Sequence, residues 1–247
     1  MRIACLSAES AVICARIGGW QDVVAVSAYA DQTGLDRRPV VSGFSTGDAE
    51  RILAHRPDIV ITFSDVQAEI AATLIRAGVT VLATNQRTLK EIAATVRLVA
   101  RAVGRGDEGE KLAADFEHQL REMRRTPLRR PRVYFEEWPD PPISGIAWVG
   151  ELIELIGGDD IFATRRGRSA SERTVCDEDV VAAVPDFVFA SWCGKKVNLP
   201  SLHRRFSDTP AARAGRIVEL PSADFLQPGP RLLDGARTLR RALEDFA

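Results

Sequence analysis

Hydrophobic and polar positions follow two kinds of pattern along this chain. Short apolar runs, such as residues 59–63 and 187–190, are bounded by Pro and Asp or by polar residues, as is typical of strands buried on both faces. Between these runs, apolar residues recur every three or four positions, which predicts amphipathic helices. Strands that alternate with helices predict an α/β fold, with Rossmann-like lobes and mostly parallel sheets.

The longest periodic stretch runs from Asp107 to about Thr126 and predicts a single long helix. Four apolar side chains share one of its faces, namely Leu112, Phe116, Leu120 and Met123. Acidic residues open the stretch and arginines close it, as the helix dipole favours. Prolines at 127 and 131 end it. We therefore expect an N-terminal lobe over 1–105, a connecting helix over 106–127 and a C-terminal lobe over 128–247.

Composition narrows the functional classes. With 45% hydrophobic and 27% charged residues and a net charge of -1, the chain is expected neither to bind nucleic acid nor to insert into a membrane. Its four cysteines contain no C-x-x-C pair, which favours free thiols in a reducing compartment. Because Met1 directly precedes an apolar strand, we expect a cytoplasmic protein, whereas a removed leader would place it in the periplasm or outside the cell.

Familiar signatures of catalysis and metal binding do not occur in the sequence. There is no G-x-G-x-x-G after the first strand, no P-loop, no G-x-S-x-G and no H-E-x-x-H. The three histidines are scattered without metal-ligand spacing. The sequence therefore predicts a non-catalytic protein with no metal site and no required cofactor.

Aromatic side chains gather just beyond the ends of predicted strands, where parallel sheets bind ligands. The positions are Tyr29, Phe44 and Phe63 in the first lobe, and Trp138, Trp192 and Phe225 in the second. Only 6% of the chain is aromatic, so such a grouping is informative. Flat rings suit a large, partly apolar ligand. Any one ring could equally well cap a core, so the prediction rests on the set.

Several polar residues are weaker candidates for contact with a ligand. Cys193, beside Trp192, could touch a ligand or a soft metal, although packing beneath the loop is the simpler interpretation. Glu136 and Glu137 are neighbours on an extended segment, so one is expected to face the ligand and the other solvent. Their segment, 136–142, contains three prolines and is expected to be a rigid loop. The arginine-rich residues 164–173 are expected to form a solvated loop.

The order of motifs resembles the cobalamin- and siderophore-type substrate-binding proteins of ABC importers, over nearly the whole chain. The segments that carry the resemblance are 2–7, 26–31, 43–45, 56–61, 151–162, 185–188 and 227–231. The Glu-Glu-Trp, Ser-Trp-Cys-Gly-Lys and Leu-Gln-Pro-Gly-Pro stretches look most like the cobalamin-binding branch. The resemblance implies two lobes joined by one long helix and a corrinoid held in the cleft between them by the six aromatic residues.

The resemblance also implies a partner. Glu50 and Glu154 match the positions of surface glutamates that dock on arginines of an ABC transporter permease, if the protein is exported. In the cytoplasm the same cleft would carry, buffer or sense a corrinoid. Two alternatives remain at this level: a ferric siderophore or haem as the ligand, and a cytosolic enzyme that modifies a bound cofactor with Cys193, Glu136 or Glu137.

Overall fold

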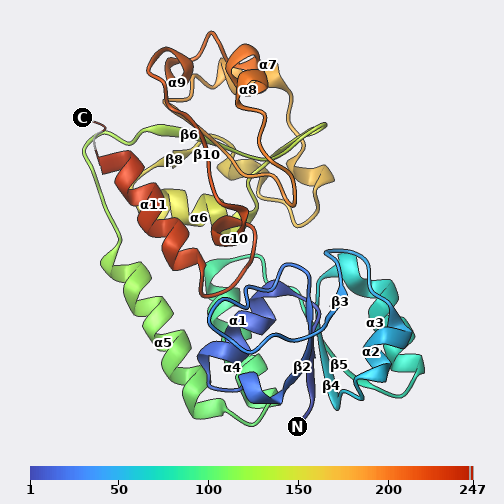
Figure 1. Cartoon of the computed structure of the whole chain (residues 1–247). Helices are drawn as coiled ribbons and strands as arrows, with labels where there is room; N and C mark the ends of the chain where they lie inside the picture. The colour runs from blue at the N-terminus through green and yellow to red at the C-terminus, as the bar shows by residue number, and fades with distance from the viewer. Residues whose placement is uncertain (245, 247) are drawn as a thin grey trace. The chain divides into compact units, whose positions relative to one another are not determined.

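The computed structural model describes residues 1–244 and 246 and divides them into two compact units, each with its own sheet (Figure 1). Unit 1 comprises Met1–Gln86 and Lys90–Glu117. Unit 2 comprises Arg87–Leu89 and the described residues from His118 onward. The mixed α/β architecture with parallel sheets confirms the predicted fold class. The division at 1–105, 106–127 and 128–247 stays a prediction.

Unit 1 is built on a parallel five-stranded sheet with the order β3-β2-β1-β4-β5. Its strands are β1 (Ile3–Cys5), β2 (Val23–Ser27), β3 (Val40–Ser42), β4 (Ile59–Phe63) and β5 (Thr80–Thr84). Every residue of the interior strand β4 is buried, which explains why four of its five residues are apolar. The carboxyl ends of all five strands consequently lie on the same side of the sheet, which we call its carboxyl edge.

Helices cover both faces of this sheet. They are α1 (Ala8–Arg16), α2 (Ala49–Ala54), α3 (Ala68–Arg76), α4 (Leu89–Ala102) and α5 (Gly106–Glu122). In Figure 1, α1 and α4 lie on one face of the sheet, and α2 and α3 lie on the other. Ile52 of α2 and Leu74 of α3 are both fully buried against that second face. Helix α5 confirms the predicted long helix, although it ends at Glu122, four residues before Thr126.

Unit 2 contains a mixed sheet with the order β10-β9-β6-β7, in which β8 also pairs with β6. Its strands are β6 (Arg132–Pro139), β7 (Pro142–Ser144), β8 (Asp159–Asp160), β9 (Phe187–Ala190) and β10 (Ile217–Glu219). Strands β6, β9 and β10 are parallel, and β7 is an antiparallel edge strand. Thus the carboxyl ends of β6, β9 and β10 share one edge.

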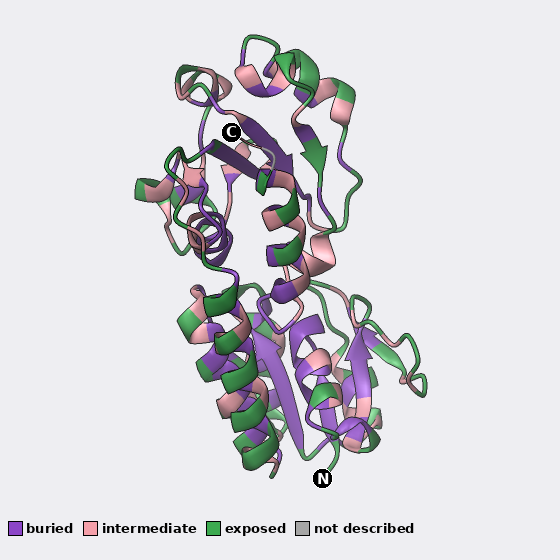
Figure 2. Ribbon diagram, turned by 90° about the vertical axis from the view of Figure 1, so that its left-hand side faces the viewer, coloured by how far each residue is buried: buried purple, intermediate pink, exposed green. Residues whose placement is uncertain are grey.

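The helices of unit 2 also form two layers (Figure 1). They are α6 (Ala147–Leu155), α7 (Asp177–Ala182), α8 (Leu199–Arg205), α9 (Pro210–Arg213), α10 (Ser222–Phe225) and α11 (Leu232–Glu244). Helices α7, α8 and α9 lie on one face, where Val180, Leu202 and Phe206 pack around Tyr134 of β6. Figure 2 shows that most strands are buried while the long helices alternate between buried and exposed positions.

The proline-rich segment after Phe135 corrects one expectation. It forms a hairpin rather than a loop, because β6 continues to Pro139 and pairs with β7. Proline is compatible with this hairpin because β7 is an edge strand, where a missing N–H costs no central ladder bond. The turn contains a cis peptide bond between Asp140 and Pro141.

Candidate functional site

Two of the predicted aromatic residues lie together at the carboxyl edge of unit 1. Tyr29 follows β2 and Phe44 follows β3, which are neighbouring strands. Their ring centroids are 6.5 Å apart in an edge-to-face arrangement. Both side chains are exposed, at 43% and 44%. Exposed aromatic pairs leave apolar surface in water, so they offer a ready contact for a flat or apolar ligand.

A buried glutamine organises the same edge. Gln67 accepts a hydrogen bond from the Phe63 N–H at 2.9 Å and donates to the carbonyl oxygens of Leu6 and Phe44, at 2.8 and 3.0 Å. One side chain therefore joins the ends of β1 and β4 to the loop that carries Phe44. The ring of Phe63 is itself buried, at 8% exposure. Nothing in the local sequence distinguishes Gln67 from an ordinary loop residue, and sequence reasoning missed it.

Glu9 is a second polar residue at this edge that the sequence did not indicate. It lies in the first turn of α1, directly after β1, and is 5% exposed. Burial raises the pKa of its carboxyl to about 7, although a hydrogen bond with Ser7 acts in the opposite direction. Its Oε1 atom has no hydrogen-bond partner in the protein. The group therefore holds its proton at a higher pH than an ordinary glutamate does.

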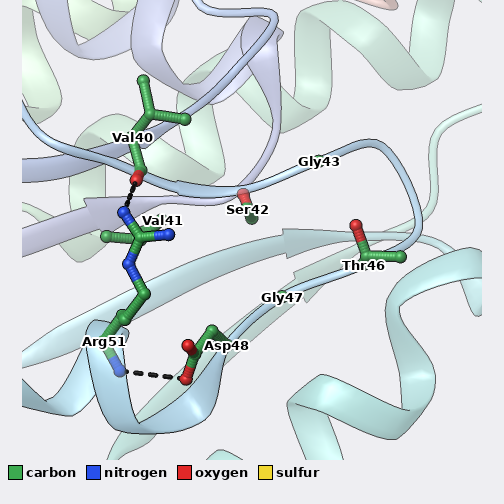
Figure 3. A pocket seen from close by; sticks show the side chains of 8 residues that line it. All are labelled: Val40, Val41, Ser42, Gly43, Thr46, Gly47, Asp48 and Arg51. Carbon is green, nitrogen blue, oxygen red and sulfur yellow. Dashed lines mark hydrogen bonds between the residues drawn. The ribbon is translucent and has the colours of Figure 1, made fainter.

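A small open pocket of about 330 Å³ lies beside the edge strand β3 (Figure 3). It is lined by Val40, Val41, Ser42, Gly43, Thr46, Gly47, Asp48 and Arg51. The Arg51 guanidinium donates to the Val40 carbonyl at 2.9 Å, and the Arg51 N–H donates to Asp48 at 3.2 Å. Local hydrogen bonds thus hold part of the pocket's lining in place, and its volume is at the lower end of the range for small-molecule sites.

In unit 2, Trp138 lies within the last part of β6 rather than after it, whereas Trp192 and Cys193 follow the end of β9. Trp138 is partly buried, its Nε1 donates to the Asp140 carbonyl at 3.0 Å, and the Lys195 ammonium lies 5.3 Å from its ring centroid. Trp192 is only 4% exposed. Cys193 is partly buried, and burial raises its pKa, as does the charge of Glu137. A raised pKa disfavours the thiolate that nucleophilic attack or metal binding would need.

Glu136 lies at the centre of a buried network. Its carboxylate accepts from Trp192 Nε1 at 3.2 Å and is paired with Arg205 at 2.7 Å. Arg205 also pairs with Asp177 at 2.6 Å, and the Tyr134 hydroxyl donates to Glu136 at 3.3 Å. Burial raises the pKa of Glu136, and the Arg205 guanidinium opposes that effect. Glu136 is therefore a support for Trp192 rather than a surface residue.

This geometry corrects two further expectations. Neither member of the Glu136–Glu137 pair points freely into solvent, because Glu136 is fully buried and Glu137 pairs with Arg173 at 2.5 Å. Arg173 itself is only 3% exposed, so this residue of the arginine-rich segment is not part of a solvated loop. Glu136 and Arg173 are thus both buried beside an opposite charge, which offsets the cost of their burial.

A second pocket, of about 350 Å³, lies at the carboxyl ends of β9 and β10. Its lining residues are Trp192, Lys195, Glu219, Leu220, Pro221 and Ser222. The Glu219 carboxylate accepts from the Val197 N–H at 3.1 Å, which ties the loop after β9 to β10. The pocket therefore combines one tryptophan wall with a lysine at the edge where the strand-end rule places ligands.

Phe225 occupies a different environment from the other aromatic candidates. It is the last residue of α10 and is fully buried, 5.7 Å from the Phe135 ring centroid. Its carbonyl accepts from Trp148 Nε1 at 2.7 Å. Phe225 is thus a helical residue in the core of unit 2. A ligand contact by the Phe225 ring stays a prediction.

The two predicted docking glutamates also differ. Glu50 is exposed in the first turn of α2. Glu154 is paired with Arg166 at 2.8 Å, and Arg166 also contacts Asp160 at 3.0 Å. Gly150 makes room for this cluster, because a Cβ there would lie 2.5 Å from Arg166 Nε. Partner docking at either position stays a prediction.

Neither a metal site nor a membrane span is found in the described part of the chain. Over residues 1–244 and 246, no three His, Cys, Asp or Glu side chains are grouped to hold a metal ion. Over the same residues, every helix is too short or too polar to cross a bilayer.

Two α/β lobes with parallel sheets, and aromatic side chains at the carboxyl edges, define a two-lobed substrate-binding protein. The chain belongs to the periplasmic binding protein family, whose model matches residues 3–223. Binding proteins of this kind are not enzymes, in agreement with the predicted non-catalytic role. The family is named for the periplasm, so the expected cytoplasmic location finds no support in it.

The names of the known proteins similar to this chain mention two kinds of ligand. A vitamin B12-binding protein from Vibrio cholerae serotype O1 is 28% identical over 244 residues, covering 94% of this chain and 85% of the relative. The structure of a periplasmic heme-binding protein from Roseiflexus sp. RS-1, in apo form, matches with a TM-score of 0.85 and 27% identity, covering 99% and 98% of the two chains. The periplasmic vitamin B12-binding protein of Vibrio cholerae matches with a TM-score of 0.79 and 24% identity, covering 98% and 96%.

Proposed function

We propose that this protein binds a corrinoid, such as cobalamin, and serves as the substrate-binding component of an ABC importer. Each unit would supply side chains from the carboxyl edge of its sheet. The observation that carries the proposal is the exposed Tyr29–Phe44 pair, which offers apolar aromatic surface at the edge where parallel sheets bind ligands. The similarity to a vitamin B12-binding protein over 94% of the chain supports the choice of ligand.

Haem is the second candidate ligand. The observation that favours it is the likeness to a heme-binding protein at 27% identity over 99% of the chain. Both ligands are flat tetrapyrrole-type macrocycles, so aromatic surfaces suit either of them. They differ in charge, because haem carries two carboxylates whereas the corrin periphery is mainly amide. A test must therefore compare both with the same protein.

Titration of the purified protein with cyanocobalamin and with hemin, followed by absorbance and calorimetry, distinguishes these ligands. We expect micromolar or tighter binding of cyanocobalamin and much weaker binding of hemin. The reverse order would transfer the proposal to haem. Binding of neither ligand at high micromolar concentration would remove both.

Variants of the aromatic pair test whether binding uses the proposed edge. Tyr29→Ala and Phe44→Ala should each weaken ligand binding by about 10-fold or more, because each removes apolar contact worth roughly 1.5–3 kcal/mol. Ile75→Ala is the matched control, since Ile75 is a 60% exposed apolar residue near the end of α3. An equal loss in all three variants would indicate a general effect on folding instead.

We further propose that the protein acts outside the cytoplasm and docks on its permease through Glu50 and Glu154. Charge reversal by Glu50→Arg or Glu154→Arg should reduce ligand uptake in cells that contain the cognate importer. Ligand affinity of the purified variants should not change. Glu69→Arg, at an exposed position of α3, is the control. Unchanged uptake in both variants would exclude these glutamates as docking residues.

A further inference from the structure

Cys5 and Cys14 form a contact that neither the fold class nor the ligand requires. Cys5 is the last residue of β1 and Cys14 lies on α1, nine positions later. Their sulfur atoms are 3.8 Å apart, and both side chains are fully buried. The other two cysteines, Cys176 and Cys193, belong to unit 2. The fold therefore brings together two thiols that no sequence motif pairs.

We propose that Cys5 and Cys14 are a site of oxidative modification that forms an intramolecular disulfide when the protein folds in an oxidising compartment. A disulfide requires its sulfur atoms to approach to about 2.0 Å. From the present separation of 3.8 Å, this needs a relative movement of less than about 2 Å. Rotation of the two side chains and a small shift of α1 can supply it, because both ends belong to one short β1–α1 unit.

The chemistry needs a disulfide oxidant, for example oxidised glutathione. The thiolate of one cysteine attacks the oxidant, a mixed disulfide forms, and one glutathione thiolate leaves. The thiolate of the second cysteine then attacks the sulfur of the first, and the second glutathione leaves. The two cysteines lose two protons and two electrons in total, and the oxidant is reduced to two thiols.

Burial determines when this reaction takes place. Neither sulfur is accessible to an oxidant in the folded protein, since both side chains are 0% exposed. Oxidation is therefore expected during folding, before α1 has packed over β1. The same burial then protects the bond from external reductants, because thiol–disulfide exchange requires access to the sulfur.

The bridge would close the segment from Cys5 to Cys14. This segment includes Leu6, whose carbonyl accepts hydrogen bonds from Gln67 and from Ser42. It therefore fixes α1 to the same carboxyl edge that carries the exposed aromatic pair. Its formation does not depend on the ligand, so the inference and the proposed function can fail independently.

Proteolysis of the wild-type chain gives a direct test. The denatured, reduced protein is refolded with a glutathione redox buffer, and free thiols are then alkylated in denaturant. Trypsin should release one peptide with both cysteines, because cleavage after Arg2 and Arg16 leaves residues 3–16 intact. Cleavage after Glu9 then separates its two halves unless a disulfide joins them.

We expect the two halves to remain joined until a reductant is added, and the intact peptide to be lighter by two hydrogen atoms. Thiol titration in denaturant should fall from four groups towards two. The bridged protein should melt roughly 5 °C or more above the reduced form. Recovery of both cysteines as alkylated residues or as separate glutathione adducts would overturn the proposal.

Two controls complete the experiment. The variant with Cys176→Ser and Cys193→Ser keeps the pair and should give the same joined peptide, which excludes a bridge to unit 2. The reduced, folded wild-type protein should oxidise much more slowly than the refolding chain. Equal oxidation rates would contradict the role assigned to burial. The same peptide, prepared from protein that was exported to a bacterial periplasm, should also contain the disulfide.

Discussion

Glu136 and Glu9 are both buried in this fold, and their surroundings differ. Glu136 is fully buried but has Arg205, Trp192 and Tyr134 within hydrogen-bond distance. Glu9 is almost as deeply buried, yet one of its carboxyl oxygens has no partner. A buried carboxylate is tolerated when an opposite charge and hydrogen bonds accompany it, and otherwise it tends to take up a proton. The two residues should therefore respond differently to mutation and to pH.

Arg205→Ala should destabilise unit 2 strongly, because it leaves the Glu136 carboxylate buried without its 2.7 Å cationic partner. The expected loss is about 3 kcal/mol or more in the free energy of unfolding. The midpoint of urea denaturation measures it. Arg240→Ala is the control, since Arg240 and Glu244 are 40% and 46% exposed and such pairs contribute about 0–1 kcal/mol. Similar losses in the two variants would contradict the role given to Glu136.

Glu9 should make the stability of the protein depend on pH near neutrality. Its folded-state pKa of about 7 exceeds the ordinary value of 4.5, so between these values the native carboxyl keeps a proton that the unfolded chain has lost. The free energy of unfolding therefore falls as pH rises through this window, and the full penalty applies above about pH 7.

Replacing Glu9 by glutamine removes this ionisation. At pH 8, Glu9→Gln should unfold at a higher urea concentration than wild type, and its free energy of unfolding should be larger by up to roughly 3 kcal/mol. This difference in free energy should shrink at pH 5. Urea titrations at several pH values give the comparison. Glu50→Gln, at an exposed position, should leave the pH profile unchanged. A profile of Glu9→Gln parallel to that of wild type would show that this carboxyl does not control it.

Sequence patterns predicted which residues lie near strand ends better than they predicted which side chains contact each other. Tyr29 and Phe44 could be placed at one edge because strand order in a parallel sheet brings successive carboxyl ends together. The partners of Glu136 could not be found, because Arg205 is 69 positions away on a helix that the pattern did not indicate. Contacts of this kind depend on packing between elements and leave no local signal.

Helices and strands were predicted correctly where every residue of a segment has the same environment, as in a fully buried strand. The buried strands β4 and β9 are almost entirely apolar, and their predicted bounds agree with the structure. The hairpin of β6 and β7 was missed because its prolines lie at an edge, where they are tolerated. The short helices α8, α9 and α10 were missed because four to seven residues carry too little periodicity.

The end of α7 contains a conformation that its side chain disfavours. Val184 follows the helix with a φ of 49°, and this β-branched residue is 50% exposed. Glycine is the usual residue at such a left-handed position after a helix. Val184→Gly should therefore stabilise the protein by about 1 kcal/mol, because the steric cost of the left-handed backbone disappears.

Thermal unfolding of three proteins tests this point. Val184→Gly should melt above wild type, whereas Val184→Ala should not, since alanine keeps the Cβ that causes the strain. Because the side chain is half exposed, its loss removes little buried apolar area. A lower melting temperature for the glycine variant would indicate that the valine side chain contributes more packing than its exposure suggests.

For the whole molecule, the important property is that each unit has its own sheet and its own core. Two such units can unfold separately, so calorimetry is expected to resolve two transitions. A ligand bound by side chains of both units would stabilise both of them. A ligand bound by one unit alone would raise only the transition of that unit.

Calorimetry with and without ligand therefore tests whether one unit or both units bind it. At 100 times the dissociation constant, cyanocobalamin should stabilise the native state by about 2.7 kcal/mol, and both transitions should move to higher temperature. Hydrogen exchange assigns each transition, since β4 reports on unit 1 and β9 on unit 2. In Tyr29→Ala/Phe44→Ala protein the ligand should lose its effect on unit 1 first, because both aromatic residues belong to that unit. If the wild-type transition of unit 1 does not respond to a ligand that binds, the exposed aromatic pair is not part of the binding site, and the site has to be sought in unit 2.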